Sequence, residues 1–241
     1  MTTKESFADT LRFFEGCFEL HAVFDDFLTL IMCPLLRNAD GTVGDFPRYH
    51  SIMQRYAVDD LFKLFNRMYI ALYLETVARK SSVQGSDVLG ECYEDLIGRE
   101  VLMPSWGACM EIASTIAETV PIVAGQPVEI VLRETYSGRL LLALARRFGK
   151  RPVYFGIESA AIFQKMTLVN LLMHHVHYGE VLHFNPADAN AFVQSCRLTP
   201  LPPRFECINA KEQSKAWQHF EKHEKLQAMK SSFQPTKSEK Q

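Results

Sequence analysis

The chain has 241 residues, of which 47% are apolar, and its formal net charge is −2. This length and apolar content suffice for a real hydrophobic core in one large or two small domains. The near-neutral balance gives no overall positive field to attract nucleic acid. Any nucleic-acid contact therefore has to come from a local basic patch.

The six cysteines are scattered along the chain, and no signal-peptide pattern is present at its start. Both features favour a reducing, cytoplasmic compartment. The longest apolar stretches are interrupted by charged residues or His well before the ~18 residues that a membrane span needs. We therefore expect a soluble protein with no membrane partner.

The first part of the chain has the pattern of amphipathic helices. Apolar side chains recur every three to four positions over residues 6–36, where Gly16 is the expected break, and again over residues 49–79. The segment DVLGECYEDLIG (87–98) has the same character. We predict an N-terminal helical domain over residues 1–97.

Residues 129–158 read as a strand, a tight turn, a helix and a second strand. An apolar β-rich run precedes Ser137-Gly138, which supplies the turn, and apolar residues of 140–145 form one helical face. The segment PVYFGI (152–157) is the second strand. Two parallel strands joined by a right-handed crossover place a ligand crevice at the carboxyl end of the first strand.

The rest of the chain extends this unit. We predict an α/β domain over residues 98–210 and a polar, Lys-rich tail over 211–241 that begins as a solvated helix and ends in disorder. The further elements predicted for the α/β domain are a helix at 105–120, a helix at 160–173, a third strand at 180–185, a short helix at 187–196, and a fourth strand at 205–208.

Six motifs occur in an order that resembles adenine-specific DNA methyltransferases of the type I restriction-modification kind. They are DVLGECYEDL (87–96), the segment Gly98 to Pro104, the strand-turn-helix at 129–148, GIE (156–158), Asn170, and VLHFN (181–185). The motif VFDDFL (23–28) resembles the methylase-like branch carried on plasmids and other mobile elements. The resemblance covers roughly residues 20 to 205.

This resemblance implies a truncated class I methyltransferase-like (Rossmann-like) sheet behind an N-terminal helical domain, because only three or four of the seven usual strands have room. It implies S-adenosylmethionine as the cofactor and the exocyclic amino group of adenine as the methyl acceptor. The residues it assigns to the cofactor are Glu134, Ser137, Gly138, Glu158 and Asn185.

The sequence departs from the pattern of the methyltransferases at the positions that carry their chemistry. Arg139 and Leu140 stand where a small residue and a second glycine give backbone clearance for the cofactor. Leu102 and Met103 precede Pro104 where an aromatic residue and Thr are usual. Leu201 replaces the Asn or Asp whose oxygen accepts a hydrogen bond from the adenine amine. No catalytic residue is assigned.

Each candidate residue also has a structural interpretation. Glu158 is either the acid that receives the ribose hydroxyls or a cap for the helix that follows it. Glu134 and Gly138 are either cofactor contacts or parts of an ordinary strand-to-helix turn. The Phe-rich face of residues 7–31 is either core or a groove for a protein partner.

Two groups of side chains favour a structural role over a binding one. The first group is four histidines: His174, His175, His177 and His183. The first three lie at a predicted helix end, where cationic side chains interact favourably with the helix dipole, and no cysteine lies at ligand spacing. We therefore expect no metal. The second group is a basic cluster after the helix of the strand-turn-helix unit: Arg146, Arg147, Lys150 and Arg151. We interpret these residues as the cations that favour a helix C-terminus, in preference to a phosphate-binding patch.

Two functional hypotheses remain. In the first, the chain is a methyltransferase homologue without methyl transfer that acts as a binding or regulatory protein in restriction-modification or mobile-element biology. In the second, it is an active adenine methyltransferase completed by another subunit. The expected partners are DNA, and a protein partner or second copy that covers the edges of the incomplete sheet.

Overall fold

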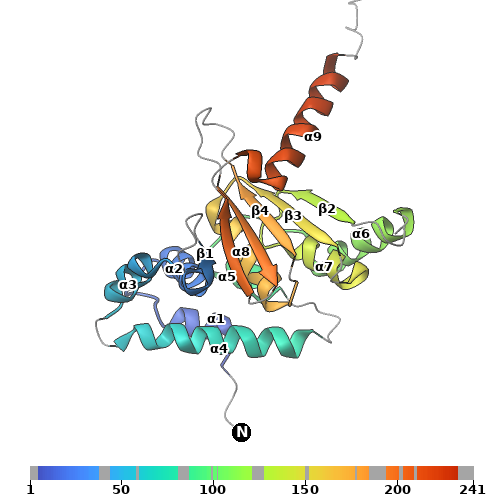
Figure 1. Ribbon diagram of the computed structural model, residues 1–241. Helices are drawn as coiled ribbons and strands as arrows, with labels where there is room; N and C mark the ends of the chain where they lie inside the picture. Colours follow the sequence, from blue (N-terminus) through green and yellow to red (C-terminus); the bar gives the residue numbers. More distant parts are fainter. Residues whose placement is uncertain are drawn as a thin grey trace, which may run out of the picture.

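The computed structural model describes residues 5–37, 44–57, 60–80, 87–98, 100–101, 103–120, 128–149, 152–176, 178–184, 194–200, 203–208 and 211–232. Within these ranges the chain forms an α/β fold with a mixed six-stranded sheet (Figure 1). The helices are α1 (Phe7–Arg12), α2 (Leu20–Met32), α3 (Phe46–Arg55), α4 (Phe62–Arg79), α5 (Val88–Leu96), α6 (Trp106–Thr119), α7 (Arg139–Phe148), α8 (Ala161–Met173) and α9 (Lys215–Ser232). The strands are β1 (Leu36–Arg37), β2 (Glu129–Arg133), β3 (Val153–Glu158), β4 (Gly179–His183), β5 (Gln194–Pro200) and β6 (Pro203–Ile208).

The sheet has the order β1-β6-β5-β4-β3-β2. Strands β2, β3 and β4 are parallel and consecutive, and they are joined through α7 and α8 into a Rossmann-like βαβαβ unit. Strands β5 and β6 form an antiparallel hairpin on β4, and the two-residue β1 pairs parallel with β6. Strand β2 is consequently an edge of the sheet over the described residues.

Helices α7 and α8 lie on the same face of the sheet, because two right-handed crossovers that step in one direction place both helices on one side. Their apolar faces join Tyr154 of β3 and Val181 of β4 in the main hydrophobic core. The opposite face carries α9, whose Trp217 and Ala216 pack in a second cluster with Phe155 of β3 (Figure 1).

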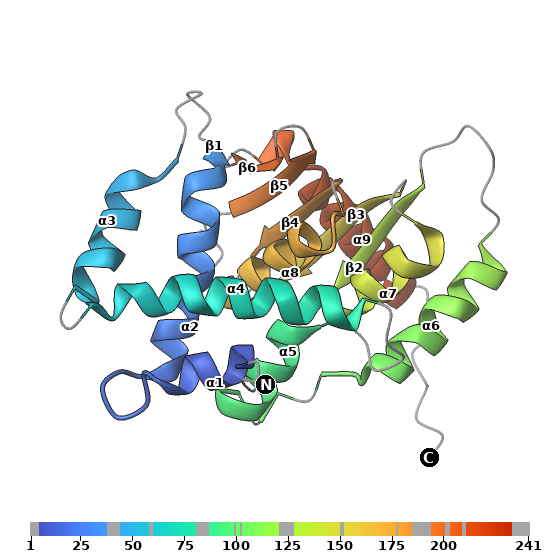
Figure 2. The same cartoon turned by 90° about the horizontal axis from the view of Figure 1, so that it is seen from below.

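The N-terminal helices pack beside α8, and α4 runs along the outside of this layer (Figure 2). Aromatic side chains fill the interior: Phe7 lies against Phe27, and the ring of Phe65 packs edge-on against Tyr56. An ion pair from Lys165 Nζ on α8 to Asp25 Oδ1 on α2, at 2.7 Å, ties the helices to the sheet. The Phe-rich face is therefore mainly core.

The structure confirms the predicted fold class, with an α/β sheet and an N-terminal helical region. It confirms the strand-turn-helix-strand unit, the break near Gly16, the helices at 87–98 and 105–120, and a helix in the tail. The start of that tail helix is not solvated as expected, because Ala216 and Trp217 are buried against the sheet. The expected disorder of the last residues falls outside the described ranges.

Two predictions about the sheet are wrong. The short helix predicted over 187–196 is contradicted at its end, because residues from Gln194 belong to β5, where they pair with β4 and β6. The sheet also has six strands, more than the three or four expected. The two additional strands are β5 and β1, and β1 comes from the predicted helical region.

None of the helices that the structure describes is both long and apolar enough to cross a membrane.

Candidate functional site

The turn between β2 and α7 follows the carboxyl end of β2 and has an unusual backbone. Glu134 and Tyr136 have φ values of 53° and 52°, in the left-handed region that non-glycine residues rarely adopt. Gly138, with φ of 82°, is the N-cap of α7. A Cβ at Gly138 would lie 3.2 Å from the Cα of Thr167 on α8, so this position needs glycine both for its conformation and for close packing.

Glu158 supports this turn from the end of the neighbouring strand β3. Glu158 is 2% exposed, and its Oε1 accepts hydrogen bonds from the Thr135 hydroxyl and, at 2.6 Å, from the Tyr136 amide. Burial raises the pKa of Glu158 to about 7, and the hydrogen bonds from Thr135 and Tyr136 oppose this rise. Glu158 does not cap the next helix, because the N-cap of α8 is Ala160 without a side-chain cap. The helix-cap interpretation is therefore wrong.

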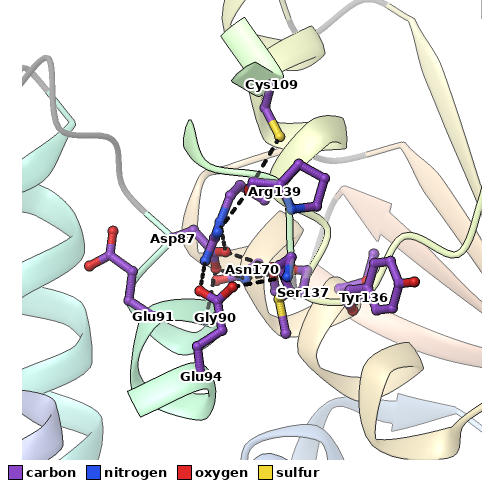
Figure 3. Close-up of polar contacts among 12 residues, drawn as sticks. Asp87, Gly90, Glu91, Glu94, Cys109, Tyr136, Ser137, Arg139 and Asn170 are labelled. Atoms are coloured by element: carbon purple, nitrogen blue, oxygen red, sulfur yellow. Dashed lines mark hydrogen bonds and ion pairs between the residues drawn. The ribbon is translucent and has the colours of Figure 1, made fainter. Parts of the chain in front are cut away.

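Arg139, the first residue of α7, points away from solvent into a buried polar network (Figure 3). Its Nε donates to Asp87 Oδ2 at 2.7 Å, one terminal nitrogen donates to the Pro104 carbonyl at 2.8 Å, and the other donates to Glu94 Oε2 at 2.7 Å. The three acceptors come from α5, its N-cap and the segment before α6. One side chain thus ties the turn to three points of the neighbouring layer.

Asp87 is the centre of this network and is 1% exposed. Besides Arg139, it accepts hydrogen bonds from Ser137 Oγ at 2.5 Å, from Asn170 Nδ2 at 2.8 Å and from the Gly90 amide at 2.9 Å. Asn170 also donates to the Ser137 carbonyl at 2.7 Å. Every lone-pair direction of the buried carboxylate is thus used within the protein, and the side chains of α5, α7 and α8 are fixed relative to each other.

A small cavity of about 50 Å³ lies beside the turn, lined among others by Met103, Glu134 and Arg139. Sites for ligands of drug size usually have about 300–1,000 Å³. A wider pocket of about 480 Å³ does exist, but mainly apolar side chains of α2, α3 and α4 line it, and it contains none of the residues assigned to the cofactor. Over the described residues, the cavity at the end of β2 is therefore smaller than the usual ligand site.

The sheet topology gives a second test of whether the end of β2 can hold the cofactor. In open α/β sheets the ligand binds where the strand order reverses, with a strand on each side of the crevice. Here β2 is the edge strand of the described sheet, and the order runs on from β2 to β3 and β4 without reversal. The described residues at the end of β2 therefore form no site that fits S-adenosylmethionine.

The structure brings four of the five assigned residues together at this turn. Glu134 lines the small cavity, Ser137 is fully buried against Asp87, and Gly138 and Glu158 hold the turn as described. Asn185 lies outside the described residues. Sequence reasoning did not identify Asp87 and Arg139 as a pair, although an Asp immediately before apolar residues such as Val88 is a typical N-cap signal.

The other candidate groups have ordinary surroundings. Among the described residues, no three His, Cys, Asp or Glu side chains are grouped so as to hold a metal ion. His174 has its Nδ1 2.8 Å from the Asn170 carbonyl at the end of α8, and His177 lies outside the described ranges. Arg146 and Arg147 occupy the last turn of α7, where cations favour the helix dipole.

Comparison with known proteins found no protein-family model and no curated protein that matches the chain. A solved structure that it resembles weakly is the methyltransferase subunit of a type I restriction-modification system from Streptococcus thermophilus, with a TM-score of 0.35 and 14% sequence identity. The match covers 77% of this chain and 58% of that one. The chain thus spans little more than half the length of that subunit.

Proposed function

We propose that this protein is a methyltransferase-like protein that does not transfer methyl groups and acts by binding, as a regulatory component of DNA modification in the cytoplasm. The observation that carries the proposal is the closed turn at the end of β2. The polar groups of Thr135, Ser137 and Arg139 are directed into the protein, and the adjoining cavity measures about 50 Å³.

The chemistry of the chain supports the same conclusion. Methyl transfer to adenine requires a bound methyl donor and an oxygen that accepts a hydrogen bond from the attacking amine. Glu158 Oε1, which the resemblance assigns to the donor's ribose, accepts two hydrogen bonds from the turn itself. Leu201, at the position of the amine acceptor, offers no oxygen on its side chain.

The edge strand β2 supports a role in binding. Its residues alternate between exposed and half-buried, and Val131 is 37% exposed. An edge strand presents backbone N–H and C=O groups that a further strand can pair with. We propose that a protein partner or a second copy covers this edge, and that the assembly contacts DNA.

Calorimetric titration with S-adenosylmethionine tests whether the protein has lost the ability to bind this cofactor. We expect no binding heat at millimolar ligand and no transfer of labelled methyl to adenine in duplex DNA. Micromolar binding in the wild type that Glu158→Gln weakens would contradict the proposal and support the active-enzyme hypothesis. Binding that Glu158→Gln leaves unchanged would place the ligand in another cavity.

DNA binding is tested separately by the fluorescence anisotropy of a labelled duplex at 50 and 200 mM salt. Non-specific DNA affinities lie at about 10⁻⁴–10⁻⁶ M and fall steeply with salt, because phosphate contacts release counterions. We expect the protein to bind at least this tightly and with this salt dependence. A dissociation constant above millimolar at low salt would remove DNA as a direct partner.

A further inference from the structure

Two of the six cysteines lie opposite each other in the sheet, although eleven positions separate them in the sequence. Cys196 of β5 and Cys207 of β6 are register partners in the antiparallel hairpin. Their Sγ atoms are 3.7 Å apart. Directly opposite residues of antiparallel strands have Cα atoms about 4.5–5.5 Å apart, within the range that disulfides span.

The two thiols differ in their access to solvent. Cys196 is 3% exposed and belongs to the main core, whereas Cys207 is half-buried at the edge of that core. The hydrogen bond to Cys207, together with burial, raises the pKa of Cys196 well above its usual value. Cys207 is therefore the thiol that a reagent from solvent reaches first.

We propose that Cys207 and Cys196 form a redox modification site, in which Cys207 reacts with a low-molecular-weight disulfide and Cys196 resolves the product. In the first step the Cys207 thiolate attacks one sulfur of oxidised glutathione. A protein–glutathione disulfide forms and one glutathione thiolate leaves. In the second step Cys196 loses its proton and attacks Sγ of Cys207, which releases the second glutathione. The two protein thiols lose two electrons and two protons in total, and one oxidised glutathione becomes two reduced ones.

The position of the pair in the fold gives the disulfide a structural effect. The hairpin lies between β4 of the Rossmann-like unit and β1 of the N-terminal region. A cross-link between its strands closes a loop of about a dozen residues and restricts the unfolded chain. The oxidised protein is therefore more stable, with a melting temperature higher by about 5–10 °C.

The test uses a Cys17→Ser variant, because Cys17 is exposed and would otherwise react with glutathione by itself. The folded protein is incubated with oxidised glutathione or with dithiothreitol, quenched in acid, alkylated and digested with trypsin. Cleavage at Arg197 and Arg204 places Cys196 and Cys207 on different peptides. We expect the two peptides to be joined after oxidation and separate after reduction. Absence of the joined pair, or a preference for other cysteines, would overturn the proposal.

The order of attack has its own test in two further variants of the same background. Cys196→Ser should accumulate one glutathione on Cys207, because the resolving thiol is absent. Cys207→Ser should remain unmodified, because Cys196 is buried. Melting curves of both reduced variants verify folding, and the oxidised parent protein tests the disulfide even if one variant fails to fold. Equal labelling of both variants would show that either thiol reacts first.

Discussion

The buried guanidinium of Arg139 gives the sharpest test of the closed turn. Substitution Arg139→Met keeps a long apolar side chain and a good helix former at the start of α7, but it removes all the donors. The guanidinium makes two ion pairs, with Asp87 and Glu94, and one hydrogen bond to the Pro104 carbonyl. Although burial acts in the opposite direction, these carboxylates raise the pKa of Arg139, so it stays charged.

The expected loss of unfolding free energy depends on the carboxylates that Arg139→Met leaves without their cation. Removing one partner of a buried ion pair typically destabilises a protein by about 3–5 kcal/mol, because the other charge is left without compensation. Asp87 keeps its donors from Ser137, Asn170 and Gly90, and Glu94 is partly exposed. We therefore expect about 3 kcal/mol, the lower end of this range.

Urea unfolding followed by circular dichroism measures the effect. With an m-value of about 3 kcal/mol/M, the midpoint of Arg139→Met falls by about 1 M. The matched control is Arg67→Met, which removes an exposed ion pair to Glu5 and should cost at most about 1 kcal/mol. The double variant Arg139→Met/Asp87→Asn should recover part of the loss, because the orphaned charge is removed. A cost for Arg139→Met no larger than that of the control would refute the buried network.

Two further predictions concern the buried carboxylates Glu158 and Glu180. Folded Glu158 holds its proton up to about pH 7 while the unfolded chain loses it near 4.5, so its ionisation lowers stability by up to about 3 kcal/mol as pH rises from 4.5 to 7. Glu158→Gln keeps the accepting oxygen but does not titrate. The unfolding free energy of this variant minus that of the wild type should therefore increase from pH 5 to pH 8. A difference that stays constant with pH would contradict the raised pKa. Ser214→Ala removes the 2.7 Å donor to Glu180 and the acceptor for the Trp217 amide, and should cost about 1–3 kcal/mol with a change in Trp217 fluorescence. The exposed cap variant Ser105→Ala is its control, and equal effects of the two would argue against the Glu180 anchor for α9.

The sequence predicted the elements whose signals are local. The unit from β2 to β3 has an apolar β-rich run, a Ser-Gly turn and a helical apolar face within 30 residues. Strand β5 was missed because its sequence, QSCRLTP, has no apolar run and its first three residues end a segment with helical spacing. Its strand conformation is evident only from its pairing with β4 and β6. Strand β1 has two residues and exists through its pairing with β6, which no local pattern indicates.

The sequence located the turn that carries the candidate residues, but not the interactions that hold this turn. The resemblance to methyltransferases assigned Glu134, Gly138 and Glu158, and these residues lie together because the carboxyl ends of neighbouring parallel strands meet at one edge of a sheet. The hydrogen bonds of Arg139 and Asn170 to Asp87 bridge 52 and 83 positions of the sequence. Such separations are set by the packing of α5, α7 and α8, which periodicity along one helix does not reveal.

These hydrogen bonds explain how the turn after β2 keeps a backbone conformation that is rare outside binding sites. Left-handed conformations at Glu134 and Tyr136 cost about 1–3 kcal/mol each and persist only where the surroundings hold them. In a nucleotide-type site, the polar groups of the ligand engage such a turn. Here Glu158 binds the Tyr136 amide, and Asp87 binds the Ser137 hydroxyl and the Arg139 guanidinium. The protein thus supplies from its own side chains the carboxylates that satisfy the turn.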